Sequence, residues 1–140
     1  MGQYVKQVKS EDRVDPSTTQ HIFDHGRLVG TWINTNQATR GITKLVVAAK
    51  DGKLFLRVFG AGSPEPHDWG KIEADVLYSD HIRSQFISAF TAQYHFDFAK
   101  IQLQANWNQG LLVVGSFSIY TDGSDRSNYF SREFFHQQGE

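Results

Sequence analysis

The sequence predicts an all-β fold, a single eight-stranded antiparallel up-and-down β-barrel. From Leu28 onward, short apolar runs alternate with turn signals about every ten residues, a rhythm typical of barrels and sandwiches. The chain has 140 residues, the usual size for a domain with one hydrophobic core. A meander of strands with one apolar face removes its exposed edges by closing into a barrel, so we expect closure here.

Two regions differ in composition. Residues 1–20 are rich in Lys, Gln, Asp and Ser and follow neither helical nor strand periodicity. We expect them to form a mobile N-terminal arm. Residues 21–140 are predicted to form the barrel domain.

The strand predictions follow the apolar runs and their turns. Asp51-Gly52 between two lysines is the strongest hairpin signal, because a type I′ turn needs positive φ at both central positions. The glycines and prolines of 60–70 exclude a strand interior there. The predicted strands are 28–35, 40–49, 53–60, 69–78, 84–95, 99–106, 111–121 and 127–136.

One segment fits two structures. Ile82, Phe86, Ile87 and Phe90 have helical spacing after a capping residue at 79 or 80, whereas alternate residues from Phe86 to Tyr94 fit a strand. We favour the strand, since β-branched and aromatic residues surround it and an eighth strand completes the sheet.

The Asp51-Gly52 turn fixes the register of its hairpin, because cross-strand partners then have numbers that sum to 103. This register places six apolar residues on one face, which we expect to point inward: Leu45, Val47, Ala49, Leu54, Leu56 and Val58. Phe55 and Phe59 then lie outside, either covered by another part of the chain or forming a subunit interface.

We expect the later strands to contribute inward residues as well. A barrel of eight strands is about wide enough to be filled by side chains or to hold one small ligand. The small residues Ala74, Ser88 and Ala92 leave room for a ligand or for neighbouring phenylalanines. The inferred inward residues are Ile72, Ala74, Val76, Tyr78, Phe86, Ser88, Phe90 and Tyr94.

The segment LVGTW, followed by strands in meander order, resembles the calycin superfamily of lipocalins, fatty-acid-binding proteins and avidins. In lipocalins a Gly-x-Trp motif on the first strand closes one end of the barrel, and its Trp packs near an Arg from the end of the chain. Gly30 and Trp32 match that motif, and the resemblance implies that Arg132 is the partner.

The local match to avidins is closer, since GTWIN and DGKL resemble the first two turns of that family. The resemblance implies that Trp32 and Asn34 mark the ligand site. The sequence departs from the avidin pattern at Ala38, where avidins have a hydroxyl residue, and at Val58, where they have a ligand-contacting Tyr. These departures argue against biotin as the ligand.

Composition excludes several classes of function. The net charge of −1 argues against nucleic acid and against an anionic membrane surface. The absence of cysteine excludes disulfides, thiolate metal sites and cysteine nucleophiles. Without an apolar signal segment or membrane span, we expect a soluble, cytoplasmic protein without a cofactor.

Three groups of residues are the main candidates for chemistry. Arg132 either stacks on Trp32 or meets a ligand carboxylate, and the structural role is favoured because Phe134 cannot donate a hydrogen bond to the ligand. His67 beside Asp68 could act as a general base, although a stiff loop is the favoured interpretation. His136 resembles the proximal histidine of nitrobindin-type haem barrels.

The remaining candidates are weaker. His21 and His25 have the i, i+4 spacing of helical metal ligands, but a solvated turn is favoured. Asp122 and Asp125 lie in a segment that lacks the spacing of a calcium loop and is better explained as an Asx-rich turn. We therefore predict no metal site.

The leading functional prediction is non-catalytic binding of a small, largely apolar molecule inside the barrel. The alternatives are an enzyme that uses His67 and Asp68, a haem protein that uses His136, and a solid structural module that forms homo-oligomers through Phe55 and Phe59. The predicted ligand-binding residues are Trp32, Asn34, Leu56, Val58, Phe86, Phe90, Tyr94 and Arg132, with no catalytic residue.

Overall fold

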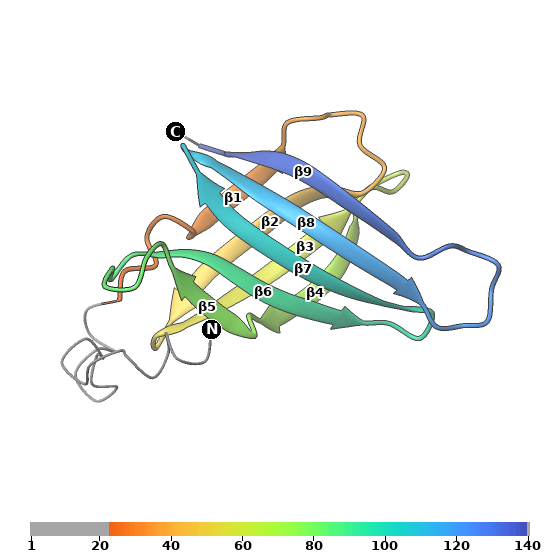
Figure 1. The fold of residues 1–140 in the computed structure, drawn as a ribbon. Helices are drawn as coiled ribbons and strands as arrows, with labels where there is room; N and C mark the ends of the chain where they lie inside the picture. The colour runs from red at the N-terminus through yellow and green to blue at the C-terminus, as the bar shows by residue number, and fades with distance from the viewer. Residues whose placement is uncertain (1–22, 140) are drawn as a thin grey trace, which may run out of the picture.

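The computed structural model describes residues 23–139, and these residues form nine β-strands and no helix (Figure 1). Within this part of the chain, therefore, no helix is long and apolar enough to cross a membrane. The strands are β1 (Gly30–Asn34), β2 (Ile42–Lys50), β3 (Lys53–Gly60), β4 (His67–Glu73), β5 (Val76–Ser79), β6 (Ile87–His95), β7 (Ala99–Asn108), β8 (Leu111–Tyr120) and β9 (Tyr129–Gln137). The predicted N-terminal arm lies outside the described residues.

All nine strands belong to one antiparallel sheet in the order β4-β3-β2-β1-β9-β8-β7-β6-β5. The sheet curls into a half-barrel, with β7 to β9 facing β2 and β3 in Figure 1. Its edge strands β4 and β5 are not paired with each other, so the predicted closed eight-stranded barrel is wrong. The all-β, antiparallel prediction is confirmed.

The ninth strand arises because the predicted strand 69–78 is two strands. Ala74 and Asp75 interrupt it between β4 and β5. The amide of Ala74 donates to Leu54 on β3 (2.9 Å), and the amide of Asp75 donates to Thr91 on β6 (2.7 Å). The chain thus leaves one edge of the sheet at Ala74 and joins the other edge at Asp75, and this crossing leaves the barrel open.

The β2–β3 hairpin has the predicted register. Leu45 pairs with Val58, Val47 with Leu56 and Ala49 with Leu54. Asp51 and Gly52 have φ values of 53° and 79°, as a type I′ turn requires. Five of the six predicted inward side chains are buried; Ala49, next to the turn of the hairpin, is exposed.

The ambiguous segment forms a strand from Ile87 to His95, which confirms the strand prediction. Ser88, Phe90, Ala92 and Tyr94 are buried as expected. The inward predictions for three other residues are wrong, because Val76, Tyr78 and Phe86 are 46%, 47% and 37% exposed. Val76 and Tyr78 are exposed because they lie on the outer face of β5, while Leu77 between them packs against the core.

The interior between the two halves of the sheet is a packed core. Trp32, Phe90 and Phe135 are its largest fully buried side chains, and branched aliphatic residues from β2, β3, β7 and β8 surround them. The Trp32 indole N–H donates to the Leu28 carbonyl at 2.9 Å, which satisfies the buried polar atom. These side chains belong to one hydrophobic cluster.

Tyr94 holds the open side of the barrel together. Its hydroxyl accepts a hydrogen bond from the Val58 amide (3.2 Å) and donates one to the Gly70 carbonyl (2.6 Å). Val58 has no partner residue in β4, because the β3–β4 register shifts between Arg57 and Phe59. Tyr94 therefore links β6 to the irregular point between β3 and β4, and burial raises its pKa to about 12.

Candidate functional site

A cavity of about 470 Å³ opens at one end of the half-barrel. This volume lies in the usual range for small-molecule sites. The lining comes from the inner faces of β7, β8 and β9, from one end of each of β2, β3 and β4, and from three connecting segments that lie around the opening. The lining residues are Arg40, Gly41, Ile42, Gly60, Ala61, His67, Asp68, Trp69, Phe96, Phe98, Ala99, Ile101, Ser116, Ser118, Tyr120, Tyr129 and Ser131.

Strand register gives the depth of each lining residue. Along the inner face of β8, the buried core residue Val114 is followed by Ser116, Ser118 and then Tyr120 at the end of the strand. Ser116 is paired with Ser131 on β9, and Ser118 is paired with Ile101 on β7. The serines therefore form the floor of the cavity above the apolar core, and the tyrosines lie at its rim.

The hydroxyls of the floor face the cavity. Ser116 and Ser118 are 8% and 5% exposed. No side-chain hydrogen bond joins Ser116, Ser118 or Ser131 to another residue within 23–139, and this part of the chain contains no fully enclosed side-chain N or O atom without a partner. The three hydroxyls are thus accessible from the cavity and available to a ligand.

Aromatic rings form one wall. The rings of Phe96 and Phe98, in the β6–β7 connection, are nearly parallel, with centroids 5.5 Å apart. Trp69 on β4 meets Phe96 edge-on at 5.6 Å and Tyr94 edge-on at 5.4 Å. Each ring is held by a neighbouring ring, so this wall is preorganised for a flat apolar group.

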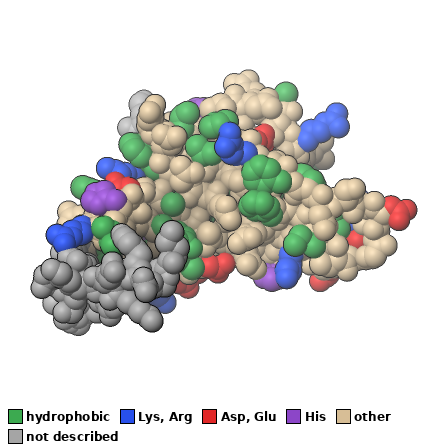
Figure 2. Space-filling view, in the orientation of Figure 1, with side chains coloured by type: hydrophobic (Ala, Val, Ile, Leu, Met, Phe, Trp, Pro, Cys, Tyr) green, Lys and Arg blue, Asp and Glu red, His purple; other side chains and the backbone are tan. Residues whose placement is uncertain are grey.

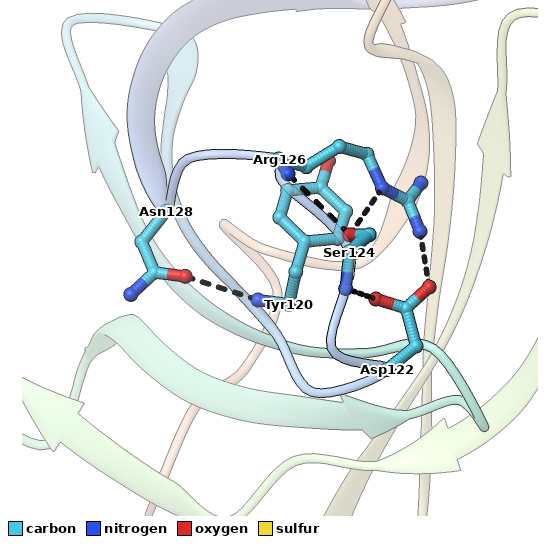
Figure 3. Close-up of polar contacts among 5 residues, drawn as sticks. All are labelled: Tyr120, Asp122, Ser124, Arg126 and Asn128. Atoms are coloured by element: carbon cyan, nitrogen blue, oxygen red, sulfur yellow. Dashed lines mark hydrogen bonds and ion pairs between the residues drawn. The ribbon is translucent and has the colours of Figure 1, made fainter.

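On the other side, Tyr120 and Tyr129 form the rim, and the β8–β9 loop lies behind Tyr120 (Figure 3). Asp122 accepts hydrogen bonds from the Ser124 amide (3.1 Å) and from the Arg126 guanidinium (2.7 Å). The pKa of Asp122 lies below its ordinary value. A hydrogen bond with the Ser124 side chain lowers this pKa most, and the Ser124 amide and Arg126 lower it further. Arg126 in turn lies over Tyr120, with its guanidinium carbon 4.3 Å from the ring centroid.

Arg126 also lies over Phe98, at 5.5 Å, and so connects the loop to the aromatic wall. Tyr120 stacks on Tyr129 at 6.3 Å. Burial raises the pKa of Tyr120, and the neighbouring Tyr129 raises it further. Tyr120 is therefore a neutral hydrogen-bonding group at neutral pH.

The charged residues of the cavity lie at its rim. Asp68 accepts a hydrogen bond from the Gly70 amide (2.8 Å) and forms an ion pair with Arg57 (3.3 Å). Asp68 is therefore bound by the Gly70 amide and by Arg57 of β3, and not by His67. Arg40 and His67 are exposed, and no described ion pair uses either of them.

The sequence-predicted ligand residues lie elsewhere, and none of the eight lines this cavity. Trp32, Leu56, Val58 and Phe90 belong to the packed core. Tyr94 adjoins the aromatic wall as the structural link described above. These four residues could contact a ligand only if it entered the packed core, and their role in ligand binding stays a prediction.

Asn34 is buried and fully used by its own turn. Its amide nitrogen donates to the Ile42 carbonyl (2.8 Å), and its oxygen accepts from the Asn36 amide (2.8 Å). Asn36 then accepts from the Ala38 amide (3.0 Å). Asn34 thereby shapes the β1–β2 connection that carries Arg40 to the rim.

Arg132 does not pack on Trp32, so that prediction is wrong. Successive residues of a strand point to opposite faces, and Arg132 lies with Phe134 on the outer face of β9 while Phe135 points inward. The Arg132 guanidinium lies 5.8 Å from the Phe134 ring centroid. Phe86 likewise lies outside the cavity, under the guanidinium of Arg27 at 4.7 Å.

The two histidine hypotheses have different outcomes. His136 is exposed on the outer face of β9, on the opposite side of the sheet from the cavity. His21 lies outside the described residues, and so the pair of His21 with His25 does too. Among residues 23–139, no group of three His, Asp or Glu side chains is placed to hold a metal ion.

The outer face of the sheet carries the two predicted interface residues. Phe55 and Phe59 are half-buried, and a lysine ammonium lies over each ring: Lys71 at 5.0 Å from Phe55 and Lys44 at 4.5 Å from Phe59. Their role in a homo-oligomer stays a prediction. Aromatic side chains with a larger exposed fraction than these two lie on β8 and β9. Several separate green patches are visible on the face shown in Figure 2.

Sequence reasoning missed the serine floor. The signal was present, because Ser116, Ser118 and Ser131 occupy alternate positions of strands that were correctly predicted. A polar side chain that points into an otherwise apolar core breaks the expected hydrophobic pattern, and such exceptions are expected at functional sites. It could not be recognised without knowing which face of β8 points inward.

Comparison with known proteins does not assign the chain to a family. No protein-family model matches the chain, and no curated protein or solved structure matches it. The curled antiparallel sheet is compatible with a barrel fold.

Proposed function

We propose that this protein binds one small molecule, without converting it, in the cavity at the mouth of the half-barrel. The observation that carries the proposal is the contrast within one interior: a packed apolar core below, and above it a cavity of about 470 Å³ with unpaired serine hydroxyls. A barrel that needed only stability would gain from apolar side chains at Ser116 and Ser118.

The site supports binding better than acid–base catalysis. A general base at His67 would be oriented by an acceptor on its other ring nitrogen. Asp68, the neighbour that could do this, is held by Arg57 and Gly70. The haem alternative is also less well supported, because His136 points away from the cavity.

The test uses Nile red, an uncharged dye that fluoresces in apolar surroundings. We expect saturable binding of one dye per chain. Ser131→Trp places an indole in the cavity and should weaken binding at least about tenfold, since a filled pocket excludes the ligand. Circular dichroism would establish that the variant keeps its strands.

The matched control is Phe130→Ser, which removes an exposed apolar ring on the outer face of the same strand. Dye binding that survives this change but not Ser131→Trp supports the mouth cavity. Failure of the unaltered protein to bind the dye, or loss of binding only in Phe130→Ser, would contradict the proposal.

A further inference from the structure

We propose that the cavity takes a flat apolar molecule that carries an uncharged hydrogen-bonding group, and that this group enters first and binds the serine floor. This inference rests on the proposed binding function and adds to it the chemical class and the orientation of the ligand.

The serine floor determines which polar group of the ligand, its head group, can bind there. Ser116 and Ser131 are cross-strand partners, and Ser118 lies two residues along β8 on the same face. Cβ atoms of directly opposed residues in antiparallel strands lie about 5 Å apart, so one carbonyl or hydroxyl group can reach more than one of these serines. Each hydroxyl can donate or accept, which suits a neutral group that does either.

The charges near the floor disfavour an ionised head group. The deepest lining residues on β7 and β8 are Ile101, Ser116 and Ser118, and none carries a charge. Glu133 lies two residues deeper than Ser131 on the same face of β9, where its carboxylate accepts a hydrogen bond from Thr39 (2.7 Å). An anionic head would approach this carboxylate, and a cationic head would lose its hydration for a single carboxylate that lies below the floor and already accepts a hydrogen bond from Thr39.

The walls set the shape of the rest of the molecule. Phe96 stacks on both Tyr94 and Phe98, and Trp69 meets Phe96 edge-on, so this row of rings offers its edges to the face of a flat aromatic group. Arg126 already lies over Tyr120 and Phe98, so the cation-binding faces of these two rings are taken. The walls therefore favour an uncharged aromatic body over a quaternary ammonium.

The test compares four probes that share one flat skeleton, by displacement of Nile red. They are naphthalene, 2-naphthol, 2-naphthoate and 2-naphthyltrimethylammonium. We expect 2-naphthol to displace the dye at a concentration about 3- to 10-fold lower than naphthalene does, the gain that one or two neutral hydrogen bonds give. Both charged probes should be weaker than 2-naphthol.

The double variant Ser116→Ala/Ser118→Ala tests whether the serine floor causes the preference for 2-naphthol over naphthalene. It should bring 2-naphthol to within about twofold of naphthalene while naphthalene itself is unchanged, because only the hydrogen bonds are lost. Gln104→Ala, an exposed position on the outer face of β7, is the control and should keep the preference.

The outcomes separate this inference from the function on which it rests. If Nile red and naphthalene bind but 2-naphthol shows no advantage, or if a charged probe equals it, the head-group assignment is overturned and the binding function stands. If the double variant keeps the preference for 2-naphthol, the orientation is overturned. If Nile red and the four probes all fail to bind, the proposed function itself fails.

Discussion

Tyr94 shows how one side chain replaces a missing strand pairing. Its hydroxyl lies between the Val58 amide and the Gly70 carbonyl, at the point where the β3–β4 register shifts. Tyr94→Phe leaves both buried backbone groups without this partner and should lower the free energy of unfolding by about 1–3 kcal/mol, measured by urea denaturation. Tyr78→Phe, at an exposed tyrosine, should change it little.

The same residue predicts a pH dependence. Burial raises the pKa of Tyr94 from 10.0 to about 12, so the folded state favours the neutral phenol. This contribution to stability is complete below pH 10 and is lost as the pH rises from 10 to 12. The Tyr94→Phe variant should lose less stability than the unaltered protein over that interval; an equal loss would contradict the assignment.

At the residue scale, the sequence predicted which side chains are buried better than it predicted which groups these side chains contact. Trp32 and Asn34 are buried as a first-strand motif predicts, yet both are satisfied by local backbone groups, Trp32 by Leu28 and Asn34 by Ile42. Arg132 was assigned to the wrong face, because its role was taken from a family motif while the alternation of β9 places it outside. Side-chain partners depend on contacts between distant strands, which periodicity does not determine.

At the element scale, the β2–β3 hairpin was predictable in full because its turn chemistry and its apolar alternation agree. The break between β4 and β5 was not predictable in this way, since Ala74 and Asp75 include neither glycine nor proline. That break is set by hydrogen bonds to Leu54 and Thr91, on two strands far apart in the sequence.

The β8–β9 loop gives a prediction at this scale. Because the folded state lowers the pKa of Asp122 from 3.8, the carboxylate supports the loop above that pH and loses this role as the pH falls through its lowered value. Asp122→Asn should produce the same loosening at neutral pH, since the ion pair with Arg126 is lost. Faster amide hydrogen exchange at Ser124 would report it.

Asp125→Asn is the matched control, because Asp125 lies in the same loop and has no described ion pair. Its exchange rates should equal those of the unaltered protein. Equal exchange in the Asp122→Asn variant would show that the ion pair does not order the loop.

At the scale of the whole molecule, strand order was predictable and closure was not. Successive strands pair as an up-and-down meander predicts, and β1 pairs with β9. The missing ladder between β4 and β5 leaves a half-barrel whose open side is joined by Tyr94 and by the packing of β4 against β6. The cavity depends on this geometry and on three connecting segments, so its position could not be derived from strand patterns alone.

The three tryptophans allow the central claim to be tested in one spectrum. Trp69 lines the cavity, whereas Trp32 is buried in the core and Trp107 lies under Arg27 at 4.8 Å. In a ¹H–¹⁵N spectrum titrated with 2-naphthol, and with Trp69→Phe used to assign the peak, we expect the Trp69 indole signal to shift to saturation while the other two stay in place. A saturating shift at Trp107 or Trp32 with none at Trp69 would place the ligand elsewhere and contradict the account.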